Sequence, residues 1–146
     1  MTDKQTLLAY RLKQAEETLS DAEKMMENRL SPWSIINRAY YAVFYSILAL
    51  FLSKNINIKT SKHVGIISIF DKEFIHTNKI DKGYSKILHK LFEARQEGDY
   101  KELIEWSIED AGDIIGLSRD FLKEMKKVIS EGKDSQWKSE MEIVYE

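Results

Sequence analysis

The most informative segment of the sequence is Asn37-Arg38-Ala39-Tyr40-Tyr41-Ala42-Val43-Phe44-Tyr45. It belongs to a predicted helix that is apolar on nearly every side. At about 100° per residue, Ser34, Arg38, Tyr41 and Tyr45 fall on one face of that helix. A guanidinium in apolar surroundings needs a partner, because an unpaired buried charge is costly. We therefore expect Arg38 either to hold a carboxylate inside the fold or to bind an anion from outside.

Helical periodicity extends outward from this stretch over most of the chain. It predicts five helices, over residues 3–28, 31–52, 61–75, 81–96 and 101–129, with a turn at Gly98-Asp99 between the last two. The second helix opens at Ser31-Pro32, a typical helix start. One proline and six glycines leave few breakers. Short connections between helices predict an all-α, up-and-down antiparallel bundle.

Composition fits one globular domain. Of the 146 residues, 43% are hydrophobic and 32% are charged, which excludes general disorder. We divide the chain into a bundle over residues 1–130 and an acidic tail over 131–146. The tail holds five acidic residues and two lysines. The bundle is then close to neutral, which argues against a generally basic nucleic-acid binder but leaves room for a local basic pocket.

The second helix predicts an oligomer. A helix that is apolar all round is either the centre of a bundle or faces both its own core and another subunit. A small bundle has little room for a fully surrounded helix. We therefore expect a homodimer that uses this helix, with Ile47 as one interface position.

Other candidate functional residues lie outside the second helix. His63, His76 and His89 lack metal-ligand spacing, and the absence of cysteine excludes thiolate zinc, so we predict no metal site. Lys62 and His63 open the third helix, where an anion is favoured, although a solvated helix start is the simpler interpretation. Arg95 either pairs with Asp99 four residues later or lines the same site as Arg38. No cofactor fingerprint is present.

The N-terminus and the apolar runs indicate the cellular location of the protein. The chain opens with a charged amphipathic pattern instead of a signal-peptide core. Its longest uncharged apolar run, over residues 39–53, is too short to span a bilayer. We therefore predict a cytoplasmic protein without a membrane partner.

Three segments, in order, resemble the HEPN family (higher eukaryotes and prokaryotes nucleotide-binding domain), in its small stand-alone prokaryotic branch. They are residues 37–44, residues 62–74 and residues 91–100. The resemblance implies an up-and-down helical bundle, a homodimer and a minimal nucleotidyltransferase partner, in a toxin–antitoxin or stress module. It also implies binding of a nucleotide or RNA, for which the candidate residues are Asn37, Arg38, Tyr41, Tyr45, Lys62, His63 and Arg95.

Many members of that family are metal-independent RNases with an arginine, four to six residues and then a histidine. Arg38 and Asn37 match, but Tyr45 stands where the histidine would be. Cleavage by 2′-OH attack needs a base with a pKa near 7, and tyrosine has a reference pKa near 10. Three hypotheses follow: a phosphate-binding regulatory module, an endoribonuclease with Arg38 and Tyr45 as a degenerate catalytic pair, or a structural dimer with Arg38 in an internal ion pair.

Overall fold

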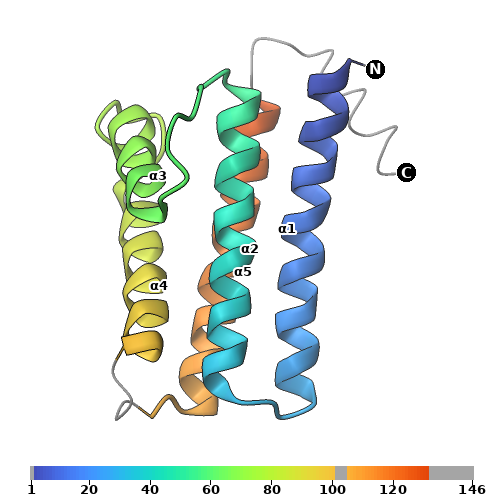
Figure 1. Cartoon of the computed structure of the whole chain (residues 1–146), viewed down its shortest axis with the longest axis vertical. Coiled ribbons are helices and arrows are strands. Elements are labelled where there is room, and N and C mark those ends of the chain that lie inside the picture. The colour runs from blue at the N-terminus through green and yellow to red at the C-terminus, as the bar shows by residue number, and fades with distance from the viewer. Residues whose placement is uncertain (1, 101–104, 132–146) are drawn as a thin grey trace.

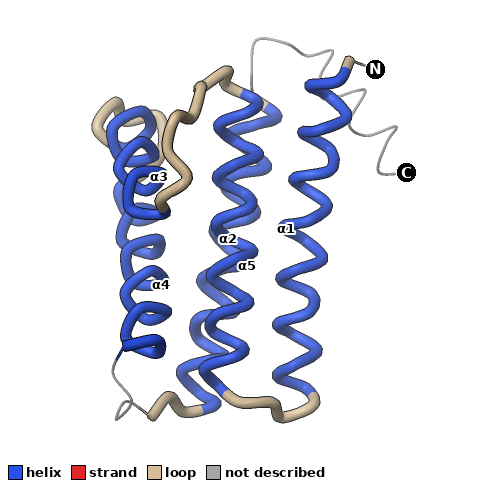
Figure 2. The backbone as a smooth tube through the Cα atoms, in the orientation of Figure 1, coloured by secondary structure: helices blue, strands red, loops and turns tan. Residues whose placement is uncertain are grey.

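The computed structural model describes residues 2–100 and 105–131 of the chain. Within these ranges every regular element is a helix and no strand is present (Figure 2). The elements are α1 (Asp3–Glu27), α2 (Pro32–Ser53), α3 (His63–Phe70), the π-helical turn η1 (Asp71–Ile75), α4 (Lys82–Tyr100) and α5 (Ile108–Ser130). The prediction of an all-α bundle of about five helices is confirmed.

The helix α2 stands at the centre of the bundle (Figure 1). In that view α1 flanks it on one side, α3 and α4 flank it on the other, and α5 lies behind it. The four long helices alternate in direction along the chain, as expected for an up-and-down bundle. The arrangement leaves one side of α2 without a covering helix.

Local sequence fixes where the helices begin. The Ser31 side chain accepts a hydrogen bond from the backbone N–H of Ser34, and Pro32 occupies the first turn of α2. Ser107 and Asp110 form a reciprocal capping box at the start of α5. Asn55 adopts a left-handed φ of 59° just after α2, a conformation that asparagine tolerates at a helix end.

The predicted boundary between the fourth and fifth helices is wrong. α4 continues through Gly98 to Tyr100, since one glycine inside a helix costs only about 1 kcal/mol. α5 begins at Ile108, not at residue 101, because the Ser107 capping box defines its start. The predicted third helix is present as α3 and η1, and it begins at His63. The acidic tail was predicted over residues 131–146, and all of it except Glu131 lies outside the described residues.

The other helices of the monomer cover most of α2. Ile35, Ile36, Ile47 and Phe51 are fully buried among its neighbours. Ile47 is therefore a core position of the monomer, and its expected place at an interface was wrong. By length and composition alone α2 could cross a bilayer, but 67% of its most apolar window is buried in the fold. It is the core helix of the bundle.

One stripe of α2 stays uncovered. Between residues 34 and 52, the positions that are at least partly exposed lie within an arc of about 100°. We call this set the α2 stripe: Ser34, Asn37, Arg38, Tyr41, Tyr45, Leu48 and Leu52. The residues predicted to share one face of this helix thus share the face that no other helix covers.

Truncating a core residue of α2 should destabilise the fold. We expect Ile47→Ala to lower the free energy of unfolding by about 2–5 kcal/mol, because it removes fully buried methyl groups and leaves a cavity. Val64→Ala, at a side chain that is 62% exposed, should change it by less than about 0.5 kcal/mol. Urea denaturation of both variants measures the difference. Equal changes in the free energy of unfolding of the two variants would contradict the burial of α2.

Candidate functional site

Arg95 of α4 reaches across to α2. Its Nε–H donates to Asn37 Oδ1 at 3.3 Å and its Nη2–H donates to Tyr41 Oη at 3.2 Å. The guanidinium carbon also lies 5.4 Å from the ring centroid of Tyr40 and 5.3 Å from that of Tyr41. These distances fit cation–π contacts with both rings. Hydrogen bonds and ring contacts together fix the guanidinium beside the α2 stripe.

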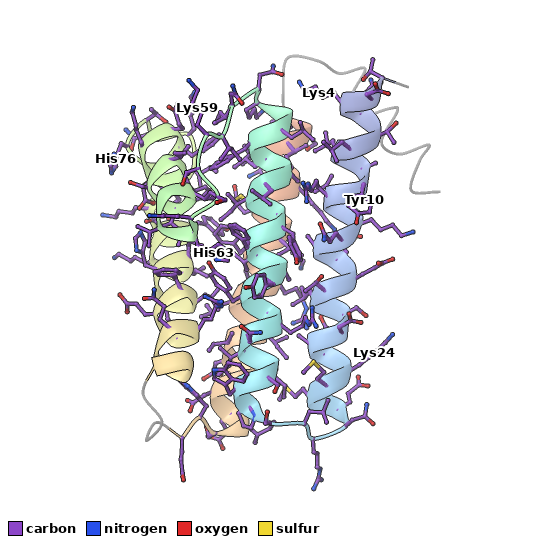
Figure 3. The ribbon with its side chains drawn as sticks, in the orientation of Figure 1. Lys4, Tyr10, Lys24, Lys59, His63 and His76 are labelled. Carbon is purple, nitrogen blue, oxygen red and sulfur yellow. The ribbon has the colours of Figure 1, made fainter. Side chains whose placement is uncertain are left out.

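His63 of α3 packs against the same part of α2. In Figure 3 its label lies between α3 and α2. Its Nδ1 is 2.7 Å from Tyr40 Oη, and its ring stacks on Phe44 with 4.0 Å between centroids. The Tyr41 ring meets it edge-on at 5.8 Å. Three helices therefore contribute to one cluster, which we call the Arg95 site: Asn37, Tyr40, Tyr41, Phe44, His63 and Arg95.

Burial and charge set the protonation of this cluster. Burial lowers the pKa of His63 below its usual value, and the positive charge of Arg95 lowers it further. Burial raises the pKa of Tyr40 well above its usual value, more than the charge of Arg95 lowers it. At neutral pH the imidazole is therefore uncharged and the Tyr40 hydroxyl keeps its proton.

The Arg95 site is rich in hydrogen-bond donors. Tyr41 Oη accepts from Arg95, which leaves the phenol proton to donate elsewhere. The Asn37 oxygen accepts from Arg95, which leaves the amide N–H groups to donate. A guanidinium, an amide and a phenol held together suit an oxyanion such as phosphate.

Arg38 does not lie inside the fold. Its side chain is exposed, and the described part of the chain offers it no hydrogen bond or ion pair. It borders a shallow hollow formed with the end of α1, near Asp21, Lys24 and Asn28. The expectation of a buried guanidinium was wrong, because Arg38 lies at the edge of the one stripe of α2 that its neighbours leave open. An internal ion pair is thereby excluded within the described residues.

The other predicted residues lie around the Arg95 site. Tyr45 is half-buried, with its ring centroid 6.0 Å from that of Tyr41. Lys62 is exposed and caps the start of α3 through its backbone. The side chain of Asp99 lies outside the described residues, so its pairing with Arg95 stays a prediction. The structure thus brings Asn37, Tyr41, His63 and Arg95 into one cluster and leaves Arg38, Tyr45 and Lys62 at its margins.

Sequence reasoning missed two members of the cluster. Tyr40 and Phe44 were not among the candidate site residues, and both are buried. Their contacts with His63 bridge about 20 residues of chain, and no spacing rule within one helix reveals such a contact. The available signal was only that both belong to the same helix face as Asn37.

A second polar cluster joins η1 to α4. Asp71 accepts a hydrogen bond from Ser85 at 2.7 Å through Oδ1, and its Oδ2 lies 2.7 Å from Nε2 of His89. Ser85 and His89 are one turn apart on α4. Neither this cluster nor another in the described ranges gathers three or more residues of the types that bind metals.

Comparison with known proteins identifies the family of the chain. The HEPN domain model matches residues 8–128. A UPF0332 protein of Thermotoga maritima is 38% identical over 132 residues, which cover 90% of this chain and 97% of that protein.

Two further relatives come from Methanocaldococcus jannaschii, and each is described as a "putative toxin". One is 33% identical over 118 residues, covering 81% of this chain and 78% of the relative. The other is 38% identical over 117 residues, covering 80% and 84%. The family match includes every residue of the Arg95 site and of the α2 stripe, and with these relatives it shows that the chain belongs to the HEPN domain family.

Proposed function

We propose that this protein is a cytoplasmic HEPN module that binds the phosphate of a nucleotide or of RNA at the Arg95 site. It acts as a homodimer and works with a minimal nucleotidyltransferase, in a toxin–antitoxin or stress module. Residues 1–130 form the binding unit and the acidic tail is a separate segment. The observation that carries the proposal is the fixed guanidinium of Arg95, bonded to Asn37 and Tyr41.

The chemistry of the site supports an anionic ligand. Charge-assisted hydrogen bonds from a guanidinium to a phosphate are among the strongest polar contacts that proteins use. Asn37 and Tyr41 hold Arg95 in place before a ligand arrives, which reduces the ordering cost of binding. Lys62, exposed at the start of α3, adds positive charge nearby and would attract the ligand.

The α2 stripe supports a dimer. Its exposed or half-buried members include Tyr41, Tyr45, Leu48 and Leu52, which are apolar or aromatic. A second copy docked on the same stripe would form an isologous interface, in which each copy presents the same residues to the other. Arg38 and Tyr45 of both copies would then lie near the two-fold axis, beside the two Arg95 sites. In that arrangement Arg38 contacts phosphate and Tyr45 donates a hydrogen bond.

Removing either arginine should weaken binding of adenosine monophosphate or of a short single-stranded RNA. We expect Arg95→Met and Arg38→Ala each to raise Kd by about tenfold or more, because a hydrogen bond to a charged group is lost. Arg38→Ala should leave the melting temperature nearly unchanged, since the side chain is exposed. Isothermal titration calorimetry and a thermal melt give the two readouts.

The matched control is Arg119→Ala. This variant removes the same charge from an exposed ion pair between α5 and Glu23 of α1. Its Kd should equal that of the unmodified protein. The proposal fails if all three variants weaken binding equally, which would indicate nonspecific charge attraction, or if Arg95→Met binds as well as the original.

A charge on the α2 stripe should dissociate the dimer without unfolding the chain. In Leu48→Asp the carboxylate can reach water in the monomer but would be buried in the dimer interface. Light scattering should then give a mass near 17.1 kDa, with helical circular dichroism retained. The control Ile108→Asp, in the first turn of α5, should stay dimeric. A folded Leu48→Asp dimer would contradict the interface.

A second candidate function is metal-independent RNA cleavage. Two observations favour it: two relatives are described as putative toxins, and Arg38 is exposed where a phosphate can reach it. Tyr45 opposes it, because a phenol is a poor general base at neutral pH. Arg38 and Tyr45 would be the catalytic pair.

Tyr45→His restores the family's arginine–histidine spacing and tests this candidate. If only the base is missing, cleavage of single-stranded RNA in a chelator should rise by up to about 10². Adding Arg38→Ala to that variant should abolish the gain. A folded Tyr45→His dimer with unchanged activity would exclude the enzyme.

A further inference from the structure

We propose that Tyr40 is a positioning residue that holds His63 in the tautomer with its proton on Nε2. His63 then offers a hydrogen-bond donor to the phosphate at Arg95 and does not act as a general base. The inference rests on the proposed function for the identity of the ligand. Its first part, the tautomer, concerns the free protein alone.

The side chains of Tyr40 and His63 are in direct contact. Tyr40 Oη lies 2.7 Å from Nδ1 of His63, the distance of a full hydrogen bond. Phe44 stacks on the imidazole, which limits its rotation away from Tyr40. The described residues give Nε2 no hydrogen bond. Nε2 is therefore the ring nitrogen that remains for a ligand.

Burial of Tyr40 determines which of the two side chains donates in this hydrogen bond. Tyr40 is fully buried, and among the described residues His63 is the only hydrogen-bond partner of its hydroxyl. If Nδ1 carried the proton and donated to Tyr40, the phenol proton would be left buried without an acceptor, which is unfavourable. The phenol therefore donates to Nδ1. A neutral imidazole that accepts at Nδ1 carries its proton on Nε2.

The surroundings of His63 favour an uncharged imidazole. The titratable groups that contact His63 or act on it are Tyr40 and Tyr41 from α2 and Arg95 from α4. Lys62 precedes it in the chain and is exposed. A second positive charge beside Arg95 is unfavourable, and a protonated Nδ1 would confront the Tyr40 hydroxyl. Both effects favour the neutral ring, in agreement with its lowered pKa.

This tautomer suits His63 to binding a phosphate and not to cleaving RNA. A general base needs an unprotonated nitrogen facing the 2′-OH, whereas this imidazole would face the ligand with an N–H group. His63 therefore does not replace the histidine that is absent at position 45. It acts with Arg95, Asn37 and Tyr41 as one more donor to a phosphate oxygen.

Nitrogen-15 NMR of the histidine rings tests the tautomer. Spectra of the unmodified protein at pH 7.5 should show His63 with Nδ1 unprotonated and Nε2 protonated, and His63→Gln assigns the signals by their loss. In Tyr40→Phe, which keeps the buried ring but removes the hydroxyl that donates to Nδ1, both tautomers should appear. A proton on Nδ1 in the unmodified protein, or an unchanged tautomer in Tyr40→Phe, overturns the proposal.

A double-mutant cycle tests the donor role. Adenosine monophosphate should bind about two- to tenfold more weakly to Tyr40→Phe and to His63→Gln, the effect of one neutral hydrogen bond. Because Tyr40 acts through His63, Tyr40→Phe should have no further effect in the His63→Gln background. Additive effects overturn the donor role. If the unmodified protein binds no nucleotide or RNA, the proposed function and the donor role both fail, while the NMR result still decides the tautomer.

Discussion

Burial of α2 among its neighbours organises the whole bundle. α1, α4 and α5 pack around it, and they cover every position between residues 34 and 52 outside a single arc. Burial of its large apolar side chains is the main source of stability for such a bundle. The polar residues of α2 can therefore lie only in the uncovered arc. The same packing that stabilises the chain thus decides where a ligand can reach it.

Tyr40 connects the core to the candidate site. Its ring is fully buried, yet its hydroxyl meets His63 and its face meets the guanidinium of Arg95. A side chain held by packing on all sides cannot shift to accommodate a ligand, so the groups bonded to it are fixed as well. The donors at this site are held by the rigid part of the fold, which favours selective binding of a ligand of matching shape.

The sequence predicted the fold well because helical periodicity reports directly on burial. It placed α1 and α2 to within one residue at their ends, where Ser31-Pro32 and the apolar spacing agree. It placed the start of α5 wrongly, since the Ser107 capping box was overlooked and Gly98 was taken as a break.

The candidate site was only partly predictable. Asn37, Tyr41, His63 and Arg95 could be named from residue type and from the family resemblance. These side chains come together only because α3 and α4 dock on α2. Periodicity within one helix carries no information about that docking. For the same reason Arg38 was expected to be buried: the pattern shows that α2 is apolar nearly all round, but the neighbouring helices decide which arc stays open.

The Asp71 cluster links α3 to α4, so the two helices should move together. Asp71 follows directly on α3 and is bonded to two residues of α4, so the two elements are clamped to each other at that point. His63 lies at the opposite end of α3, and Arg95 lies further along α4. Any tilt of α3 and α4 relative to α2 would therefore displace the imidazole and the guanidinium together, as parts of one rigid unit.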